Sequence, residues 1–257
     1  MANIKLYKFN PINTTYYASG STDASYPLTN LNSFYSSDYW KSANSTNGQY
    51  LRMLDTTSGK TFCVIDNSNI QAIVTAGGRV ILASSNDPAF GSGITTIKRW
   101  ESGYDAFSRI TTFASNSHQY FRIYYEVLAS IVPYVGNFWI GIELDLGVPY
   151  AYSFKAGAKG YSTTERIALN GYLRGSQSVS GGRSFWKLPL KTLSTTIQGY
   201  FTTFFNSVQG KGIPFYFLDT DGTTLSLVTF DMDENPLDLT QVNYADGEII
   251  MKSIEVS

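Results

Sequence analysis

Two aromatic segments carry the side chains best suited to bind a ligand. The segment SFYSSDYW contains Tyr35, Asp38 and Trp40, and the segment KRWESGY contains Trp100 and Tyr104. Flat aromatic faces can stack on sugar rings, while neighbouring carboxylate, amide and guanidinium groups can bond the sugar hydroxyls. These five residues are therefore candidates for a sugar site. For each of them, burial in a core or contact with another subunit is the alternative.

The sequence offers little for catalysis. Its single histidine, His118, precedes a strand-like run without an evident partner, so we expect a solvated imidazole. The sequence contains no nucleophile elbow, phosphate loop, dinucleotide fingerprint, CxxC or HExxH motif. A pair of catalytic carboxylates is defined by its separation in space, so a glycan-degrading enzyme remains an alternative. Our prediction is a protein that is not an enzyme.

Acidic turns are the remaining candidates for metal chemistry. Five acidic residues lie in the segments DTDG and FDMDENP: Asp219, Asp221, Asp231, Asp233 and Glu234. The other positions of a calcium loop are not filled, so we expect turn carboxylates that face water. The loops 23–25 and 32–38 could hold a structural calcium, but no ligand set follows from the sequence. We therefore predict no cofactor and no assigned metal.

Charge is sparse in this chain, whereas aromatic residues are abundant. Charged residues make up 15% of the 257 residues, while Tyr and Phe number 19 and 16. This balance suits an all-β protein, and it also suits a subunit that packs against other subunits. The formal net charge of -1 provides no general attraction to phosphates or anionic lipid. We expect no sequence-specific nucleic-acid partner.

The single cysteine and the N-terminal segment give expectations about the compartment. Cys63 lies in an apolar run, where it should be buried, and it cannot form an internal disulfide. The first residues lack the apolar core of a signal peptide, and no window approaches the roughly 18 apolar residues of a membrane helix. We expect a protein made in a cytoplasm without a cleaved signal and without membrane insertion.

Short apolar runs separated by Gly, Ser, Asn and Asp predict strands in the first half of the chain. These runs are KTFCVID, QAIVTAG, RVILASS, YFRIYYEVL and FWIGIELDL. The run YFRIYYEV alternates, so residues 121, 123 and 125 can join a core while residues 120, 122 and 124 carry polar tips. Pro133 should mark a turn or a sheet edge.

One stretch of the second half, residues 194–210, reads as an amphipathic helix. Its apolar face contains Ile197, Phe201, Phe204, Phe205 and Val208, with Tyr200 beside them. We expect Thr195 and Gln198 to form a capping box and Gly210 to end the helix. An aromatic face of this width needs cover, either from the helix's own sheet or from a neighbouring subunit.

The remaining runs of the second half predict an antiparallel α+β unit. Strands are expected at IPFYFLD, TLSLVTFD and GEIIMKSIEV, and the turn DTDG should join the first two. The glycine-rich segment 155–182 reads as an arm around one strand, and we expect it to become ordered on assembly. The predicted organisation is a β-sandwich over residues 1–147, followed by an α+β domain over residues 148–257.

Several segments resemble the galactose-binding-like (discoidin-type) β-sandwich found in many phage virion proteins. They are YPLTNLNSFYSSDYWKSA, YLRMLDTTSGKTFCVIDNSNI, RVILASSNDP, HQYFRIYYEV and NFWIGIELDLG. The family's motif positions correspond to Pro27, Asn30, Leu31, Trp40, Arg122 and Ile123. The resemblance implies a jelly-roll sandwich whose late aromatic-Arg-Ile strand fills the core.

The second half resembles the tail-tube-like domain of phage tail-tip and distal-tail proteins. The similarity covers RSFWKLPL, the predicted helix, IPFYFLDTDGTTLSLVTFD and GEIIMKSIEV. It implies a split barrel with one packed helix that assembles into a homo-oligomeric ring. The predicted function is a structural virion protein, a distal-tail or tail-tip ring subunit that connects the tail tube of a phage to its adhesion apparatus. We expect it to contact other tail proteins, and it could touch host glycans. The alternative is a carbohydrate-binding adhesin or accessory module that forms no ring.

Overall fold

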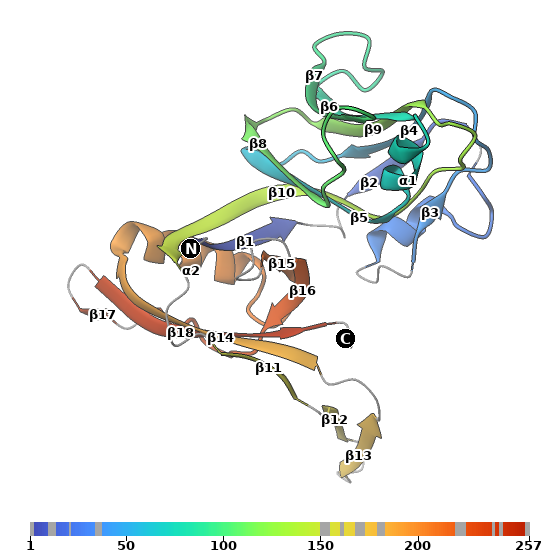
Figure 1. Cartoon of the computed structure of the whole chain (residues 1–257). Helices are drawn as coiled ribbons and strands as arrows, with labels where there is room; N and C mark the ends of the chain where they lie inside the picture. Colours follow the sequence, from blue (N-terminus) through green and yellow to red (C-terminus); the bar gives the residue numbers. More distant parts are fainter. Residues whose placement is uncertain are drawn as a thin grey trace. The chain divides into compact units, whose positions relative to one another are not determined.

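The chain divides into two compact units (Figure 1). The computed structural model describes residues 3–9, 14–20, 22–33, 38–149, 155–159, 162–167, 173–178, 183–218, 225–237, 240–241 and 244–254. Unit 2 is Phe9–Glu143, and unit 1 combines Met1–Lys8 with Leu144–Ser257. The sequence predicted that residues 1–147 form one domain. In the structure, residues 1–8 belong with the second half because strand β1 (Asn3–Phe9) pairs with β15 (Phe215–Leu218).

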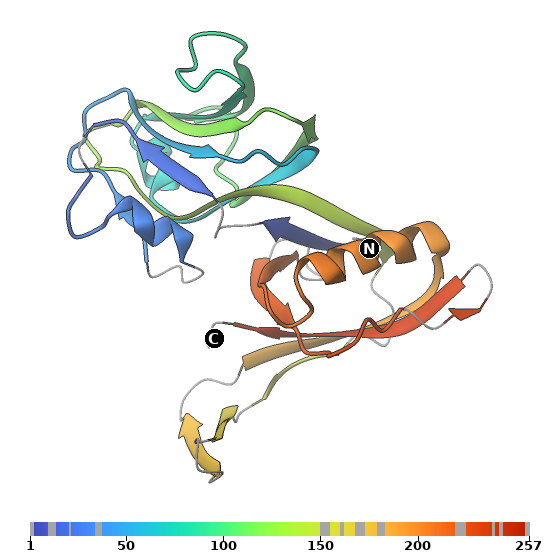
Figure 2. The ribbon, with the colours of Figure 1, turned by 180° about the vertical axis from the view of Figure 1, so that it is seen from behind.

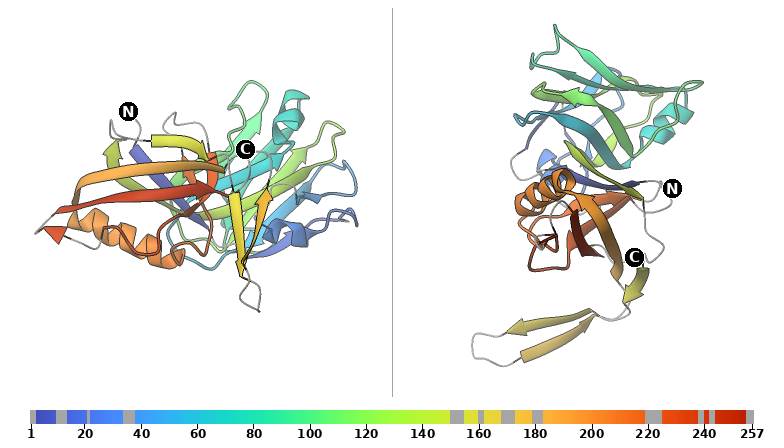
Figure 3. Two further views of the ribbon diagram at one scale, coloured as in Figure 1. Left: turned by 90° about the horizontal axis from the view of Figure 1, so that it is seen from below. Right: turned by 90° about the vertical axis from the view of Figure 1, so that its left-hand side faces the viewer.

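Unit 2 is a sandwich of two antiparallel sheets, as Figure 3 illustrates. The first sheet has the order β2 (Thr15–Ala18), β4 (Gln49–Leu54), β9 (Tyr120–Val127), β6 (Arg79–Ser85) and β7 (Thr95–Glu101). The second sheet places β5 (Lys60–Ser68) between β8 (Ile110–Asn116) and β10 (Tyr134–Pro149), and β3 (Trp40–Lys41) pairs with β10. A short 3-10 helix spans Leu28–Asn32.

The core of unit 2 lies between these two sheets. Alternation puts Phe121, Ile123 and Tyr125 of β9 into that core, where all three are fully buried, and leaves the even-numbered residues on the opposite face. Cys63 is buried in the same core as a free thiol, as its apolar run predicted. The predicted β-sandwich and the predicted alternation of β9 are therefore confirmed.

The run QAIVTAG was predicted as a strand, but it forms helix α1 (Ile70–Thr75). Its buried residues are Ile70, Ile73 and Val74, whose spacing of three and four matches one face of a helical turn. Asn69 precedes the helix, and its side chain joins the segment before β10 by donating to Val132 O at 2.8 Å. A run this short fits both periods, and packing against the sandwich selects the helix.

Unit 1 is built on an antiparallel sheet with the order β11 (Lys155–Lys159), β14 (Arg183–Ser194), β18 (Tyr244–Ser253), β16 (Leu225–Phe230), β15 and β1. The short strand β17 (Thr240–Gln241) pairs with β18. Strand β10 continues from unit 2 into unit 1 across residue 143. The predicted strands at β15, β16 and β18 are confirmed, while the turn DTDG lies outside the described residues.

Helix α2 (Thr195–Ser207) lies against the sheet of unit 1 (Figure 2). The aromatic face predicted from the sequence is covered within the unit. Phe201, Phe204, Phe205 and Val208 join a core with side chains of the sheet, and Ile197 packs against that core. Tyr200, which the sequence placed beside this face, is 58% exposed.

Both ends of α2 differ from the expected caps. Ser194 is the N-cap, and its hydroxyl accepts a hydrogen bond from Ile197 N at 3.4 Å. The predicted capping box is wrong because the Gln198 side chain instead donates to Leu237 O. At the C-terminal end, Gln209 and Gly210 both have positive φ, of 54° and 57°. Gln209 therefore enters the left-handed conformation one residue before the predicted glycine.

Part of the glycine-rich arm 155–182 is described. Strand β11 pairs with β14, and β12 (Ser162–Ile167) pairs with β13 (Leu173–Ser178) in a separate two-stranded sheet. Ordering of the arm on assembly stays a prediction.

Candidate functional site

Two of the predicted sugar-binding residues are core residues. Trp40 and Trp100 are fully buried, so neither ring presents a face to a ligand. The Trp40 indole donates to Thr22 Oγ1 at 3.2 Å, and the Trp100 ring meets Phe107 edge to face at 5.4 Å between centroids. For these two residues, the packing alternative explains the tryptophan.

The other three candidates do not assemble into a described site. Asp38 is exposed, Tyr35 lies outside the described residues, and Tyr104 is 73% exposed. The charges around Tyr104 are already balanced. Lys98 Nζ lies 2.5 Å from Asp105 Oδ2, and Arg99, whose guanidinium is 5.7 Å from the Tyr104 ring centroid, pairs with Glu101 at 2.8 Å.

A different surface gathers aromatic and cationic side chains on unit 2. It is the face of the β2-β4-β9-β6-β7 sheet opposite the core, and we call it the tyrosine-arginine face. Its members are Tyr17, Tyr50, Arg52, Tyr120, Arg122 and Tyr124. Antiparallel register builds it, since Tyr17 pairs with Arg52, Arg52 with Arg122, and Tyr50 with Tyr124.

Arg52 is held between two tyrosine rings. Its guanidinium lies 4.4 Å from the Tyr17 ring centroid and 5.5 Å from the Tyr120 ring centroid. One guanidinium nitrogen, Nη1, donates to the Pro88 carbonyl oxygen, while Nε is buried and has no hydrogen-bond partner among the described residues. A cation over an aromatic face is stabilised by the ring quadrupole, so the guanidinium is fixed in place.

Arg122 is held in the same manner on the next strand. Its guanidinium lies 4.1 Å from the Phe90 ring centroid and 4.8 Å from the Tyr124 ring centroid. Its Nε is also buried without a hydrogen-bond partner in the described part of the chain. Burial lowers the pKa of Arg122 from its ordinary value, because a desolvated cation is less stable than a hydrated one.

The loop between β6 and β7 fixes the aromatic partner of Arg122. The Asp87 carboxylate accepts hydrogen bonds from the backbone N–H groups of Ala89, Gly91 and Ser92, at 2.8, 2.8 and 3.1 Å. These bonds lower the pKa of Asp87. Phe90, inside this loop, has φ of 54° and is 6% exposed. The loop thus packs the Phe90 ring against the Arg122 guanidinium of the tyrosine-arginine face.

No carboxylate neutralises these two arginines within the described residues. The ion pairs found there engage other basic side chains of unit 2, including Arg79 with Glu101 and with Glu126. Like charges directly opposite each other on neighbouring strands destabilise a sheet. Arg52 and Arg122 are therefore a paired cationic site with no counter-charge in the described part of the protein.

His118 has a partner, contrary to the expectation of a solvated ring. Its Nδ1 lies 3.0 Å from Ser84 Oγ, which also accepts a hydrogen bond from Asn116 Nδ2 at 2.9 Å. Ser84 is fully buried, so its hydroxyl is not placed to attack a substrate. Lys60, also fully buried, donates to the carbonyl oxygens of Thr57 and His118. The cluster joins two loops of unit 2.

Most of the described aspartates in the predicted acidic turns form ion pairs with lysines. Asp231 lies 2.9 Å from Lys252 Nζ, Asp233 lies 2.6 Å from Lys211 Nζ, and Glu234 is exposed. In the first half, Asp23 lies 3.6 Å from Lys41 Nζ. Within the described ranges, no group of three or more His, Cys, Asp or Glu side chains could hold a metal. Asp219 and Asp221, and most of the loop 32–38, lie outside the described residues, so a structural calcium stays a prediction.

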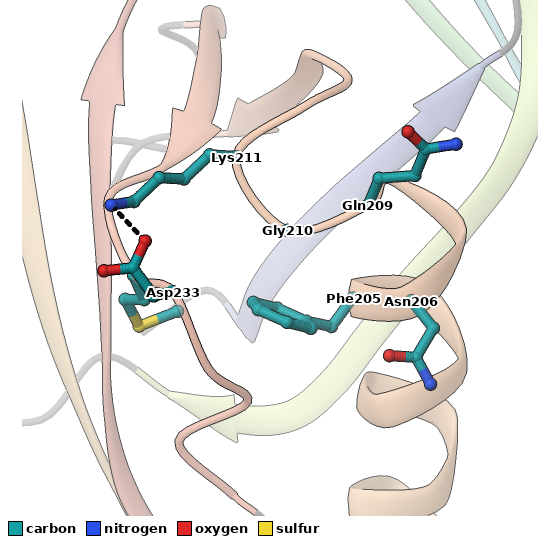
Figure 4. A pocket seen from close by; sticks show the side chains of 7 residues that line it. Phe205, Asn206, Gln209, Gly210, Lys211 and Asp233 are labelled. Atoms are coloured by element: carbon teal, nitrogen blue, oxygen red, sulfur yellow. Dashed lines mark ion pairs between the residues drawn. The ribbon is translucent and has the colours of Figure 1, made fainter.

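Unit 1 contains a pocket of about 310 Å³ beyond the end of α2 (Figure 4). Its lining consists of Phe205, Asn206, Gln209, Gly210, Lys211, Met232 and Asp233. The ion pair between Lys211 and Asp233 closes one side, and the association with Asp233 raises the pKa of Lys211. The charges of this pocket therefore compensate each other, unlike those of the tyrosine-arginine face.

Among the described residues, no helix has the length and apolar character that crossing a membrane requires.

Sequence comparisons give no family for this chain. No family model matches it, and no curated protein matches it.

Solved structures give matches that cover about half of the chain. The chain is similar to chitosan-binding module 1 of a chitosanase/glucanase from Paenibacillus sp. IK-5, with 18% identity, 52% coverage of this chain, 98% of that chain and a TM-score of 0.41. It is also similar to module 2 of that enzyme in complex with chitotriose, with 17% identity, 51% and 98% coverage and a TM-score of 0.41. A family 32 CBM from C. perfringens NanJ in complex with galactose matches with 9% identity, 53% and 98% coverage and a TM-score of 0.40. Values this low carry no argument about function.

Proposed function

We propose that this chain is a non-catalytic carbohydrate-binding protein whose ligand surface is the tyrosine-arginine face of unit 2. The observation that supports this proposal is the arrangement of four tyrosines around two arginines on one face of a sheet. Tyrosine combines an apolar ring with a hydroxyl, so it can contact both the apolar face and the hydroxyls of a sugar. Tyr17 is exposed and the other three tyrosines of the face are partly exposed, so a ligand placed over them could contact both rings and hydroxyls.

The rigidity of this face also favours binding. Ring-to-guanidinium contacts of 4.1 to 5.5 Å hold both arginines before any ligand arrives. Side chains that are already ordered lose less conformational entropy when a ligand binds. The buried Ser84 next to His118 gives no nucleophile that would favour hydrolysis instead.

A glycan-binding measurement on the whole chain tests the proposal. A panel of neutral and acidic oligosaccharides is screened with the native chain, with Tyr17→Ala and with Tyr200→Ala. Tyr17 is 39% exposed on the proposed face, whereas Tyr200 is 58% exposed on α2 of unit 1. We expect Tyr17→Ala to weaken binding and Tyr200→Ala to leave it unchanged. Failure of the native chain to bind any glycan on the panel would refute the proposal.

A second candidate function is the structural subunit of a phage tail, in which homo-oligomeric rings contact other tail proteins in the virion. It is favoured by the resemblance of the second half and by the position of β11 at the end of its sheet order, where an edge could pair with a neighbouring copy. The two functions are compatible, because a ring could display unit 2 toward host glycans. Light scattering at increasing concentration tests ring formation, for which a monomer at all concentrations would be the contrary result.

A further inference from the structure

We infer that the tyrosine-arginine face selects acidic glycans, with Arg52 and Arg122 together binding the carboxylate groups of uronic acid residues. This inference rests on the proposed carbohydrate-binding function and names the class of sugar.

The tyrosine-arginine face has a positive charge that no described carboxylate balances. Arg52 and Arg122 are direct cross-strand partners, and facing side chains of this kind have Cβ atoms about 4.5–5.5 Å apart. Neither arginine takes part in an ion pair with a described carboxylate, in contrast to Arg79, Arg99 and Arg109. Two neighbouring like charges repel each other, so the face is electrostatically complementary to an anion placed over both.

The hydrogen-bond donors of the two guanidinium groups match a carboxylate. Guanidinium groups bind carboxylates through two parallel N–H···O bonds, which a neutral sugar hydroxyl cannot match. Arg122 makes contacts with rings, its Nε is buried, and no hydrogen bond from it to a described residue is present, so its two terminal nitrogens remain available as donors at the face. Arg52 uses Nη1 on the Pro88 carbonyl and keeps its other terminal nitrogen.

The choice among anions follows from the net charge of the chain and the hydroxyls of the face. A nucleic acid is bound through many phosphates, and this chain has a net charge of -1. The proposed face carries two cations and four tyrosine hydroxyls, a set that suits a chain with carboxylates beside many hydroxyls. A polyuronate has this chemistry, because each sugar carries one carboxylate beside its hydroxyls.

Isothermal titration of the full chain with hexamers of galacturonic acid tests this inference. The same hexamer with its carboxylates methyl-esterified is the matched ligand, because it differs only in charge and bulk at each carboxylate. We expect binding of the acid that weakens as salt is raised, and binding of the ester that is at least 10-fold weaker. Poly(U) serves as the polyanion with phosphates instead of carboxylates, and we expect it to bind more weakly than the acid.

Variants of single arginines complete the test. Arg52→Gln and Arg122→Gln should each weaken acid binding by about 10-fold or more, because each removes one charged donor group. Arg99→Gln is the matched control, because Arg99 lies on β7 of the same sheet but already pairs with Glu101. It should bind within about twofold of the native chain. Arg122→Lys keeps the positive charge but lacks the planar set of guanidinium N–H donors, so it should bind with intermediate affinity. Thermal melting confirms that each variant is folded.

The outcomes separate this inference from the proposed function. Equal binding of the acid and the ester would overturn the selectivity for carboxylates while leaving carbohydrate binding intact. No binding of either hexamer or of any glycan would overturn both. Tighter binding of poly(U), or an equal loss in Arg99→Gln, would also overturn the inference, because the attraction would then be general charge and not the cross-strand pair.

Discussion

Replacement of Phe201 by Ala should strongly destabilise unit 1, whereas the same change at its neighbour Tyr200 should not. The Phe201 ring is fully buried and contacts two other rings, with centroid distances of 6.2 Å to Phe205 and 5.7 Å to Phe230. Truncation of a buried Phe to Ala costs about 3–5 kcal/mol. Ala has the better helix propensity, which offsets about 0.5 kcal/mol of this cost and leaves a loss of about 2.5–4.5 kcal/mol.

Tyr200→Ala gains the same helix propensity but gives up only a side chain that is 58% exposed, so we expect a change within about 0.5 kcal/mol. Differential scanning calorimetry of the whole chain measures both variants. For a unit of this size, the loss in Phe201→Ala corresponds to a Tm decrease on the order of 10–15 °C. The core of unit 2 contains neither residue, so its transition should keep its temperature.

Two results would refute this reasoning. Equal losses in the two variants would mean that α2 is rotated from the orientation described. A normal melting temperature for Phe201→Ala, together with a smaller assembly in light scattering, would mean that the aromatic face of α2 serves contact between subunits.

Three further predictions concern backbone conformation and pH. Gly78→Ala should destabilise unit 2 by about 1–3 kcal/mol, because a Cβ there would lie 2.7 Å from two backbone carbonyl oxygens. Gly199→Ala should stabilise α2 by up to about 1 kcal/mol, because no atom lies within 4 Å of the new Cβ. Urea unfolding compares the two variants. Gln209→Gly should stabilise unit 1 by about 1 kcal/mol, because Gln209 holds φ of 54° after α2; an unchanged urea midpoint would contradict this. Burial raises the pKa of Tyr16 and Tyr125, so these phenols stay protonated in the folded chain but ionise near pH 10 when it unfolds. Stability should therefore hold below about pH 10 and be lost as the pH rises further, and Tyr125→Phe, which removes a hydroxyl without a hydrogen-bond partner among the described residues, should reduce that loss in alkaline melts.

The sequence predicted those features that depend on local periodicity. The alternation of β9 identified Phe121, Ile123 and Tyr125 as core residues, and the helical spacing of α2 identified its buried aromatic face. Ends of elements were harder to place. Ser194 takes the N-cap position because the chain leaves β14 there, and the Gln198 side chain finds a partner in Leu237, which is distant in sequence.

The candidate site depended on information that the sequence does not display. Trp40 and Trp100 looked suited to stacking on a sugar, yet side chains from both sheets of the sandwich bury them. The sequence does not single out Arg52, because its strand, QYLRML, lacks a strong motif. The alternation of this strand was nevertheless a signal in the sequence, since Tyr50 and Arg52 alternate with Leu51 and Met53.

The register between strands β4 and β9 places Arg52 and Arg122 in one candidate site. Arg52 and Arg122 are 70 positions apart in the sequence, and only the antiparallel pairing of β4 with β9 places them opposite each other. A shift of one residue in either strand would send its arginine into the core and bring a core residue to the surface. The buried neighbours Leu51 and Ile123 exclude that shift, because their exposure would cost several kcal/mol. The same hydrophobic pattern that fixes the fold therefore also maintains the unbalanced pair of charges, and a ligand anion is the group that would relieve their repulsion.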